Sequence, residues 1–101
     1  MSGYRFEGDW VNDMRNGYGR EEAENGDLYE GQFVNDARHG HGRFLSFHGE
    51  EYDGEWANNQ RSGQGVSTIY PENEVEAIRM RITAQLLVHR DRHFLRLDRI
   101  K

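Results

Sequence analysis

The fold is decided by the stretch Tyr29-Glu30-Gly31-Gln32-Phe33 and the segment after it, Val34-Asn35-Asp36-Ala37-Arg38-His39-Gly40-His41-Gly42-Arg43. It reads as aromatic, acidic, glycine, any residue and aromatic, then a short polar loop, then Gly-x-Gly. The same phrase precedes it as Phe6-Glu7-Gly8-Asp9-Trp10 with Gly17-Tyr18-Gly19, and follows it as Tyr52-Asp53-Gly54-Glu55-Trp56 with Gly63-Gln64-Gly65. Each element recurs 23 residues on, and a fixed period of this size is typical of repeat architectures.

Each repeat is predicted to be a hairpin of two short strands. Successive side chains of a strand point to opposite faces, so Tyr29, Gly31 and Phe33 share one face. A regularly placed strand glycine indicates close approach of another group, here a neighbouring aromatic ring. The segment 35–38 is typical of a turn, and Asn25-Gly26 and His48-Gly49 are expected to close the next turns, since Asn-Gly is the strongest two-residue hairpin signal. Three successive hairpins predict a mainly β fold, a single-layer antiparallel meander.

The three sequence repeats resemble MORN repeats (membrane occupation and recognition nexus), whose motif is close to Tyr-Glu-Gly-x-Trp, then Gly-x-Gly after a polar loop. The resemblance covers about residues 4 to 74. It predicts a repeat array at 4–73, with repeats at about 6–28, 29–51 and 52–74, and a separate tail at 74–101. Phe6 stands where tyrosine is usual. Glu72 replaces the closing glycine of the third repeat, which suggests that the array ends there.

Charge divides the chain into an acidic array and a basic tail. Residues 1–74 carry 15 Asp or Glu and 6 Lys or Arg, a net −9, whereas residues 75–101 carry 3 and 7, a net +4. With 101 residues, 35% of them hydrophobic, the chain is expected to form one small array with a thin core. It holds no cysteine for a disulfide or a thiolate metal site, and no apolar run approaches the roughly 18 residues of a membrane span.

The tail is predicted to be an amphipathic α-helix from residue 74 to about residue 99. Asn73 is a candidate N-cap, with Glu76 three residues on as in a capping box. Helical spacings of three and four join one stripe, Val75, Ile78, Ile82, Leu86, His89, His93, Leu97 and Ile100. A second stripe consists of Ala77, Met80, Ala84 and Leu87. One stripe is expected to cover the open face of the ribbon, and the other to face a partner. The alternation along residues 78–82 leaves a strand as the alternative.

No catalytic arrangement is indicated, so the chain is predicted not to be an enzyme and to need no cofactor. The Gly-x-Gly pairs continue into a strand instead of a helix N-terminus, which argues against a phosphate loop. The repeated carboxylates are typical of a solvated strand face and not of a glycosidase pair. No metal site is expected, because further ligands at zinc spacing are missing around the candidate histidines, His39, His41, His48, His89 and His93.

The first functional hypothesis is a non-enzymatic scaffold or adaptor that docks to other proteins of a larger complex. The family resemblance implies an accessory subunit of an intracellular assembly, either cytoplasmic, cytoskeletal, ciliary or associated with an organelle membrane. The candidate partner-binding residues are Phe6, Trp10, Tyr29, Phe33, Tyr52 and Trp56 in the array, and Ile82, Leu86, Phe94 and Leu97 in the tail.

The alternative hypothesis is a peripheral membrane protein that attaches to anionic lipid through the basic helix. Its candidate lipid-binding residues are Arg90, Arg92, Arg96 and Arg99. A third hypothesis is a homodimer, formed by antiparallel tail helices or by ribbons that meet end to end, because the edge strands of a meander offer unpaired backbone groups. Nucleic acid binding is not expected, since no aromatic platform accompanies the arginines.

Overall fold

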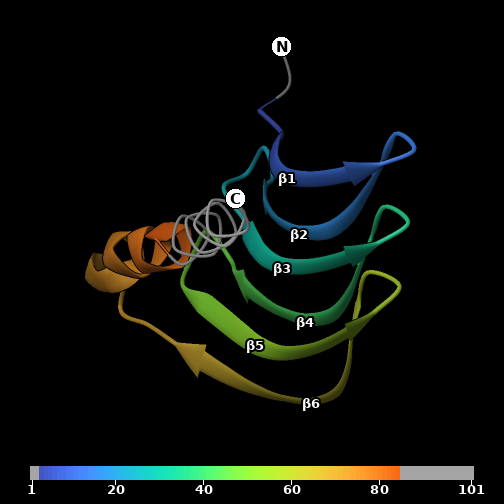
Figure 1. Cartoon of the computed structure of the whole chain (residues 1–101). Coiled ribbons are helices and arrows are strands. Elements are labelled where there is room, and N and C mark those ends of the chain that lie inside the picture. Colours follow the sequence, from blue (N-terminus) through green and yellow to red (C-terminus); the bar gives the residue numbers. More distant parts are fainter. Residues whose placement is uncertain (1–2, 85–101) are drawn as a thin grey trace, which may run out of the picture.

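The structure of this protein is a computed structural model, which describes residues 3–84. These residues form the strands β1 (Arg5–Val11), β2 (Met14–Glu22), β3 (Leu28–Val34), β4 (Ala37–Leu45), β5 (Glu50–Ala57) and β6 (Gln60–Ile69). Each strand pairs antiparallel with the next, in the order β1-β2-β3-β4-β5-β6, and the sheet bows along the length of its strands (Figure 1). The predicted single-layer meander of hairpins is confirmed.

One glycine from every strand lies in a single row across the sheet. The paired positions, from β1 to β6, are Gly8, Gly19, Gly31, Gly42, Gly54 and Gly65. The Tyr29 ring lies over Gly42, so a Cβ atom added to Gly42 would overlap this ring. Tyr52 covers Gly65 in the same way. The prediction that the glycines make room for neighbouring rings is therefore confirmed.

The turns within the three hairpins are two-residue turns in which both residues have positive φ. The angles are 51° and 66° at Asn12-Asp13, 47° and 71° at Asn35-Asp36, and 51° and 70° at Asn58-Asn59. Positive φ at both positions is the geometry of a type I′ turn, whose twist matches that of the paired strands. Asparagine and aspartate tolerate this region better than other residues with a Cβ atom.

The Asn25-Gly26 segment does not form the two-residue turn that its sequence predicts. Only Gly26 has positive φ, at 98°, and the loop between β2 and β3 is longer. The amide of Gly26 donates to the carbonyl oxygen of Ala23, and the amide of Ala23 donates to the carbonyl oxygen of Asp27. This loop joins one repeat to the next, so its geometry is set by the spacing of repeats and not by the local Asn-Gly preference.

After β6 the chain makes a 3-10 turn (Glu72–Glu74) and continues as an α-helix through residues 75–84, the last that are described. The predicted helix is confirmed over these residues, and the strand alternative for residues 78–82 is wrong. The predicted N-cap at Asn73 is also wrong. Pro71 precedes the turn with φ −59°, and its carbonyl accepts from the amide of Glu74, so Asn73 lies inside the turn.

The helix packs on the sheet at the end opposite the two-residue turns (Figure 1). Its first apolar stripe is buried against two leucines of the sheet, and the cluster consists of Leu28, Leu45, Val75, Ile78 and Ile82. The two leucines alternate with Tyr29 and Phe44, so they belong to the face without the repeated rings. The array therefore has two small cores, one on each face of its sheet.

Candidate functional site

The repeated aromatic residues form a continuous row on one face of the sheet. Tyr29 and Phe33 are 1% and 2% exposed, and Tyr52 and Trp56 are 7% and 6% exposed. Within repeats, edge-to-face contacts join Phe6 to Trp10, Tyr29 to Phe33 and Tyr52 to Trp56, with ring centroids 5.2, 5.1 and 5.5 Å apart. Between repeats, Phe6 contacts Phe33 at 5.2 Å and Tyr29 contacts Trp56 at 5.3 Å. Edge-to-face contact is a favourable arrangement of aromatic rings.

One arginine per repeat covers these rings. The guanidinium carbon of Arg15 lies 5.0 Å from the centroid of Phe33, and that of Arg38 lies 5.4 Å from the centroid of Trp56. In both cases the ring belongs to the following repeat. Arg61 lies 4.7 Å from the centroid of Tyr52, in its own repeat. An arginine over an aromatic face is attracted electrostatically and also shields the ring from water.

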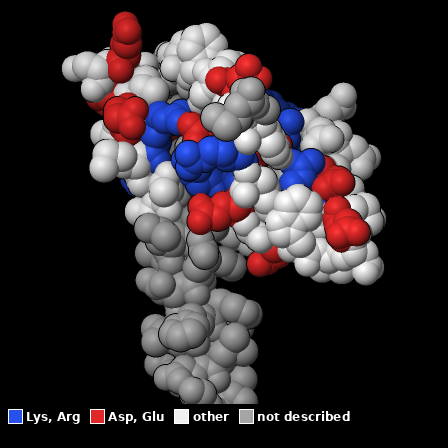
Figure 2. Space-filling view, turned by 90° about the horizontal axis from the view of Figure 1, so that it is seen from above, with Lys and Arg blue, Asp and Glu red and all other residues white. Residues whose placement is uncertain are grey.

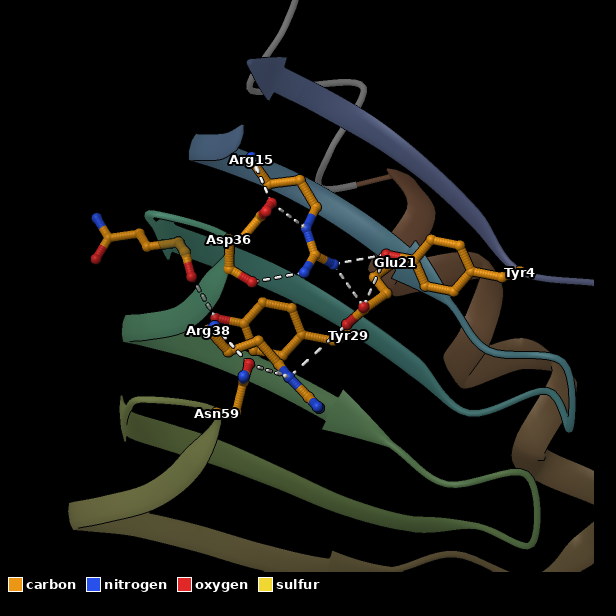
Figure 3. A network of polar contacts seen from close by, with 8 residues as sticks. Tyr4, Arg15, Glu21, Tyr29, Asp36, Arg38 and Asn59 are labelled. Carbon is orange, nitrogen blue, oxygen red and sulfur yellow. Dashed lines mark hydrogen bonds and ion pairs between the residues drawn. The ribbon is translucent and has the colours of Figure 1, made fainter. Parts of the chain in front are cut away.

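Two of these arginines, Arg15 and Arg38, also bind the turn of the next repeat. The amide of Arg15 donates to Asp36 Oδ1 at 2.8 Å, its Nε donates to the same oxygen at 3.1 Å, and the amide of Asp36 donates to the Arg15 carbonyl at 2.9 Å. One repeat later, the amide of Arg38 donates to Asn59 Oδ1 at 2.9 Å, and the amide of Asn59 donates to the Arg38 carbonyl at 3.0 Å. We call each of these contacts, between an arginine of one repeat and a turn residue of the next, a joint. Figure 3 shows both joints.

Glu21 connects Arg15 and Arg38. Its carboxylate lies 2.8 Å from Arg15 NH1 and 3.7 Å from Arg38 Nε, and it accepts from the Tyr4 hydroxyl at 2.9 Å (Figure 3). Burial, together with the hydrogen bond to the Glu21 carboxylate, raises the pKa of Tyr4 to about 12. These residues therefore form a network of paired charges that covers the aromatic rings.

The structure separates the predicted partner-binding residues of the array into two groups. Tyr29, Phe33, Tyr52 and Trp56 are buried, and their surface is used within the array. Trp10 is 56% exposed, and Phe6 is half-buried. Among the described residues, the ring of this face that is open to a partner is therefore that of Trp10 in the first repeat.

The opposite face carries a row of charges of alternating sign. Paired positions on β2 to β5 hold Arg20, Glu30, Arg43 and Asp53. Arg43 NH2 lies 3.1 Å from Asp53 Oδ2, whereas Glu30 is 5% exposed and its Oε2 makes no hydrogen bond within the described residues. Burial raises the pKa of Glu30 to about 7, and the nearby Arg43 opposes this rise. Glu30 is thus a buried carboxyl group that titrates near neutral pH.

Salt bridges and hydrogen bonds hold the helix on this face. Arg79 NH2 lies 2.6 Å from Glu22 Oε2, and Arg79 NH1 donates to the carbonyl of Gly26 at the end of the loop after β2. Arg20 Nε donates to Thr83 Oγ1 at 3.2 Å. Ile82, a predicted partner-binding residue, is completely buried between the helix and the sheet, so it belongs to the chain's own core. Of the second stripe, Ala77, Met80 and Ala84 are exposed, with Met80 at 66%, and Leu87 lies outside the described residues.

The remaining predicted residues of the tail lie outside the described residues: Leu86, Phe94 and Leu97 for a partner, and Arg90, Arg92, Arg96 and Arg99 for lipid. Among residues 3–84, basic side chains are mixed with acidic ones on the face seen in Figure 2. Over the same residues, no helix has both the length and the apolar character needed to cross a bilayer.

The histidines of the array are not gathered into a ligand cluster. His41 Nε2 lies 2.9 Å from Asp53 Oδ1, and His39 and His48 are exposed. In the part of the chain that the structure describes, no three histidine, cysteine or carboxylate side chains come together in a way that could hold a metal ion.

The sequence interpretation missed the structural role of Arg15, Arg38 and Arg61. Their recurrence at 23 residues was a usable signal, because it places one arginine per repeat on the same face as the rings. What the recurrence does not reveal is that Arg15 and Arg38 reach forward to the turn of the next repeat. That contact depends on how the hairpins stack.

Comparison with known proteins agrees with this architecture. A search of curated proteins finds no match for the chain. The sequence model of the MORN repeat family matches three segments, residues 6–28, 29–46 and 52–70, which together make up more than half of the chain. The first segment coincides with the repeat predicted at 6–28, and the other two begin at the predicted residues 29 and 52 but end earlier than predicted. The chain therefore belongs to the MORN repeat family.

Proposed function

We propose that this protein is a non-enzymatic adaptor that docks to a partner protein within a larger assembly. The observation that carries the proposal is the two-sided helix of residues 75–84. Val75, Ile78 and Ile82 are buried against the sheet, while the described residues of the second stripe, Ala77, Met80 and Ala84, are exposed. A helix that is apolar on two sides is normally buried on both. MORN repeats are found in scaffold and membrane-binding proteins, which supports this type of function.

The use of the repeated polar groups supports a non-enzymatic role. Arg15 and Arg38 bind the turns of the next repeats, and Glu21 binds both arginines. These groups stabilise the contacts between hairpins. Catalysis by general acids and bases requires groups within hydrogen-bond reach of a substrate, and these residues are instead engaged with one another.

The proposed docking element is the outer stripe of the helix, Ala77, Met80 and Ala84. Small and flexible apolar side chains allow a second helix to approach closely, and methionine adapts to irregular surfaces. The proposed partner is therefore a protein that presents an amphipathic helix or an apolar groove. Within the cell, we place the complex at a cytoskeletal, ciliary or organelle-membrane structure.

The test is a chemical cross-linking pull-down from native extract with the full chain, identified by mass spectrometry. Met80→Glu puts a charge on the outer stripe without touching the buried stripe. The matched control is Glu76→Gln, which changes the charge at an exposed position of the same helix. The proposal expects one set of proteins, captured by the parent and the control, with cross-links to the helix, and lost with Met80→Glu. Equal capture by all three chains would contradict docking through this stripe.

A second candidate function is binding to anionic membranes, and it is favoured by the charge of the tail. Residues 85–101 contain five Lys or Arg and two Asp. Each basic residue near an anionic surface contributes about 1 kcal/mol, and the attraction weakens as salt is added. The full chain should then sediment with vesicles that contain phosphatidylserine, and neutralising Arg90, Arg92 and Arg96 together should abolish this. Equal binding to neutral vesicles would rule out the electrostatic mechanism.

A further inference from the structure

The two ends of the array lack complementary parts of the same joint. Each internal joint combines an arginine of one repeat with an Asp or Asn in the turn of the next, as in Arg15 with Asp36 and Arg38 with Asn59. In the 23-residue register, the next arginine is Arg61, and the preceding turn residue is Asp13. Arg61 lies on β6, and within residues 3–84 no following turn meets it. Asp13 lies in the hairpin of β1 and β2, and within the same residues no arginine of a preceding repeat meets it.

The backbone at both ends is already shaped for this contact. Asp13 has φ 66°, close to the 71° of Asp36 and the 70° of Asn59, and its side chain is exposed. The side chain of Arg61 is 40% exposed, compared with 18% for Arg15 and 27% for Arg38. Arg61 lies over the Tyr52 ring, much as Arg38 lies over the Tyr29 ring of its own repeat. Only the partner from the next repeat is missing.

The aromatic row is incomplete at the same two ends. Trp10 is equivalent in the repeat to Phe33 and Trp56, yet it is 56% exposed, whereas they are 2% and 6% exposed. The preceding repeat buries Phe33 by contact with Phe6 and Arg15, and it buries Trp56 by contact with Tyr29 and Arg38. Within residues 3–84, no repeat precedes that of Trp10. At the other end of the array, Arg61 is the exposed group equivalent to Arg15 and Arg38, and it lies over the buried ring of Tyr52.

We propose that the β1 edge of a second copy of this chain docks on the β6 edge, so that the two arrays continue as one sheet. The internal register predicts the pairs. Gly17 pairs with Phe33 and Gly40 with Trp56, so Gly63 should pair with Trp10 of the second copy, and Gly65 with its Gly8. The glycine row would then cross the boundary without interruption. Open edge strands supply backbone donors and acceptors for such an addition.

The joint uses different surfaces on the two copies. Arg61 and Tyr52 belong to one copy, and Asp13 and Trp10 belong to the other. Such a heterologous contact leaves a free β6 edge and a free β1 edge on the dimer, so further copies can add in the same way. On the opposite face, Val66 stands where Arg20 and Arg43 stand in earlier repeats, so the charge pairing of that face is not part of the joint. The selectivity for a second copy lies in the aromatic and arginine face.

The test measures self-association of the full chain by sedimentation velocity over a range of concentrations. Asp13→Arg and Arg61→Asp should each weaken self-association by about tenfold or more, because each places like charges at the joint. Asp13→Asn is the control and should associate like the parent, because Asn59 makes the same contact as Asp36. Circular dichroism of each variant checks that the array is folded.

Mixing the two charge variants gives the decisive result. The Asp13→Arg chain still has Arg61, and the Arg61→Asp chain still has Asp13, so a native joint can form between them. The proposal expects the mixture to associate more strongly than either variant alone. The proposal is overturned if the parent is monomeric at every concentration, if the mixture stays monomeric, or if both variants associate like the parent, since the last result would place the contact elsewhere.

Discussion

The indole Nε1 of Trp56 donates a buried hydrogen bond of 3.1 Å to the carbonyl oxygen of Gly42 on the neighbouring strand. It joins a side chain of the third repeat to the backbone of the second. The same indole contacts the ring of Tyr29 and is covered by Arg38, both from the second repeat. Trp56 is thus a major contact between repeats. Trp10 is its equivalent in the first repeat, so the two residues allow a direct comparison of a buried ring and an exposed one.

Replacing Trp56 with phenylalanine should destabilise the protein, whereas the same change at Trp10 should not. Trp56→Phe leaves the Gly42 carbonyl without this donor and removes buried ring area, with an expected cost of about 1–3 kcal/mol. Trp10→Phe changes an exposed ring and should stay within about 0.5 kcal/mol of the parent. Urea unfolding followed by far-ultraviolet circular dichroism measures both. Equal effects of the two substitutions would mean that the burial and the hydrogen bond of the Trp56 indole do not contribute to stability.

Adding a methyl group at Gly42 should disrupt the packing of the central ring. The new Cβ atom would overlap the Tyr29 ring, which lies directly over this backbone, and overpacking of this kind costs about 1–3 kcal/mol or more. Gly3→Ala is the matched control, because Gly3 is exposed and the atoms nearest to a Cβ atom there are the flexible side chain and the Cα of Glu24. The melting temperatures of the two variants give the comparison. A Gly42→Ala protein as stable as its control would contradict the position of the Tyr29 ring.

The titration of Glu30 should make the protein less stable as the pH rises from about 4.5 to about 7. The pKa of Glu30 is raised to about 7 in the folded chain from an ordinary value of 4.5, so the folded state holds the proton more tightly than the unfolded state. Protonated Glu30 therefore favours folding at low pH, and this contribution is lost as the pH passes the folded pKa. At about 1.4 kcal/mol per pKa unit, the loss is on the order of 3 kcal/mol.

Glu30→Gln isolates this effect from the other carboxylates. Glutamine has the same shape without a charge, so its stability relative to the parent should increase from pH 4.5 to pH 7 and then level off. Urea unfolding at a series of pH values gives the difference between the two proteins. Glu55→Gln, at an exposed position of the neighbouring hairpin, is the control for the loss of one negative charge. A pH-independent difference for Glu30→Gln would show that this carboxyl group ionises normally.

Shortening Ile82 should release the helix before it affects the sheet. The described helix is held by three buried apolar side chains and by the contacts of Arg79 and Thr83, and an isolated helix of this length is marginal in water. Ile82→Ala should therefore speed hydrogen exchange of the amides in residues 75–84 more than exchange in β3 and β4. Met80→Ala, on the exposed side, should leave these rates unchanged. Uniform acceleration across the chain would indicate that helix and sheet unfold together.

Much of the fold could be predicted from the sequence because the period determines local structure. Three copies of the motif, spaced by 23 residues, determine where the strands lie, which face of the sheet carries the rings and where the glycines stand. The helix after Pro71 also follows from local spacing. Predictions that depend on only two or three residues were less reliable. Asn73 does not cap the helix, and Asn25-Gly26 does not form a two-residue turn, because the connections between larger elements override these weak local preferences.

The candidate site could be predicted only in part, because a side chain's burial depends on its neighbours in space. Trp10 and Trp56 occupy the same motif position, but only Trp56 has a preceding repeat to cover it. Likewise, the sequence gives Glu7, Glu30 and Asp53 one equivalent position, whereas stacking of the hairpins buries only Glu30. The sequence by itself determined the repeat and its two faces, since these are local and periodic. Tertiary structure decided which face receives the helix and which rings are buried, since those depend on contacts between residues that are far apart in the sequence.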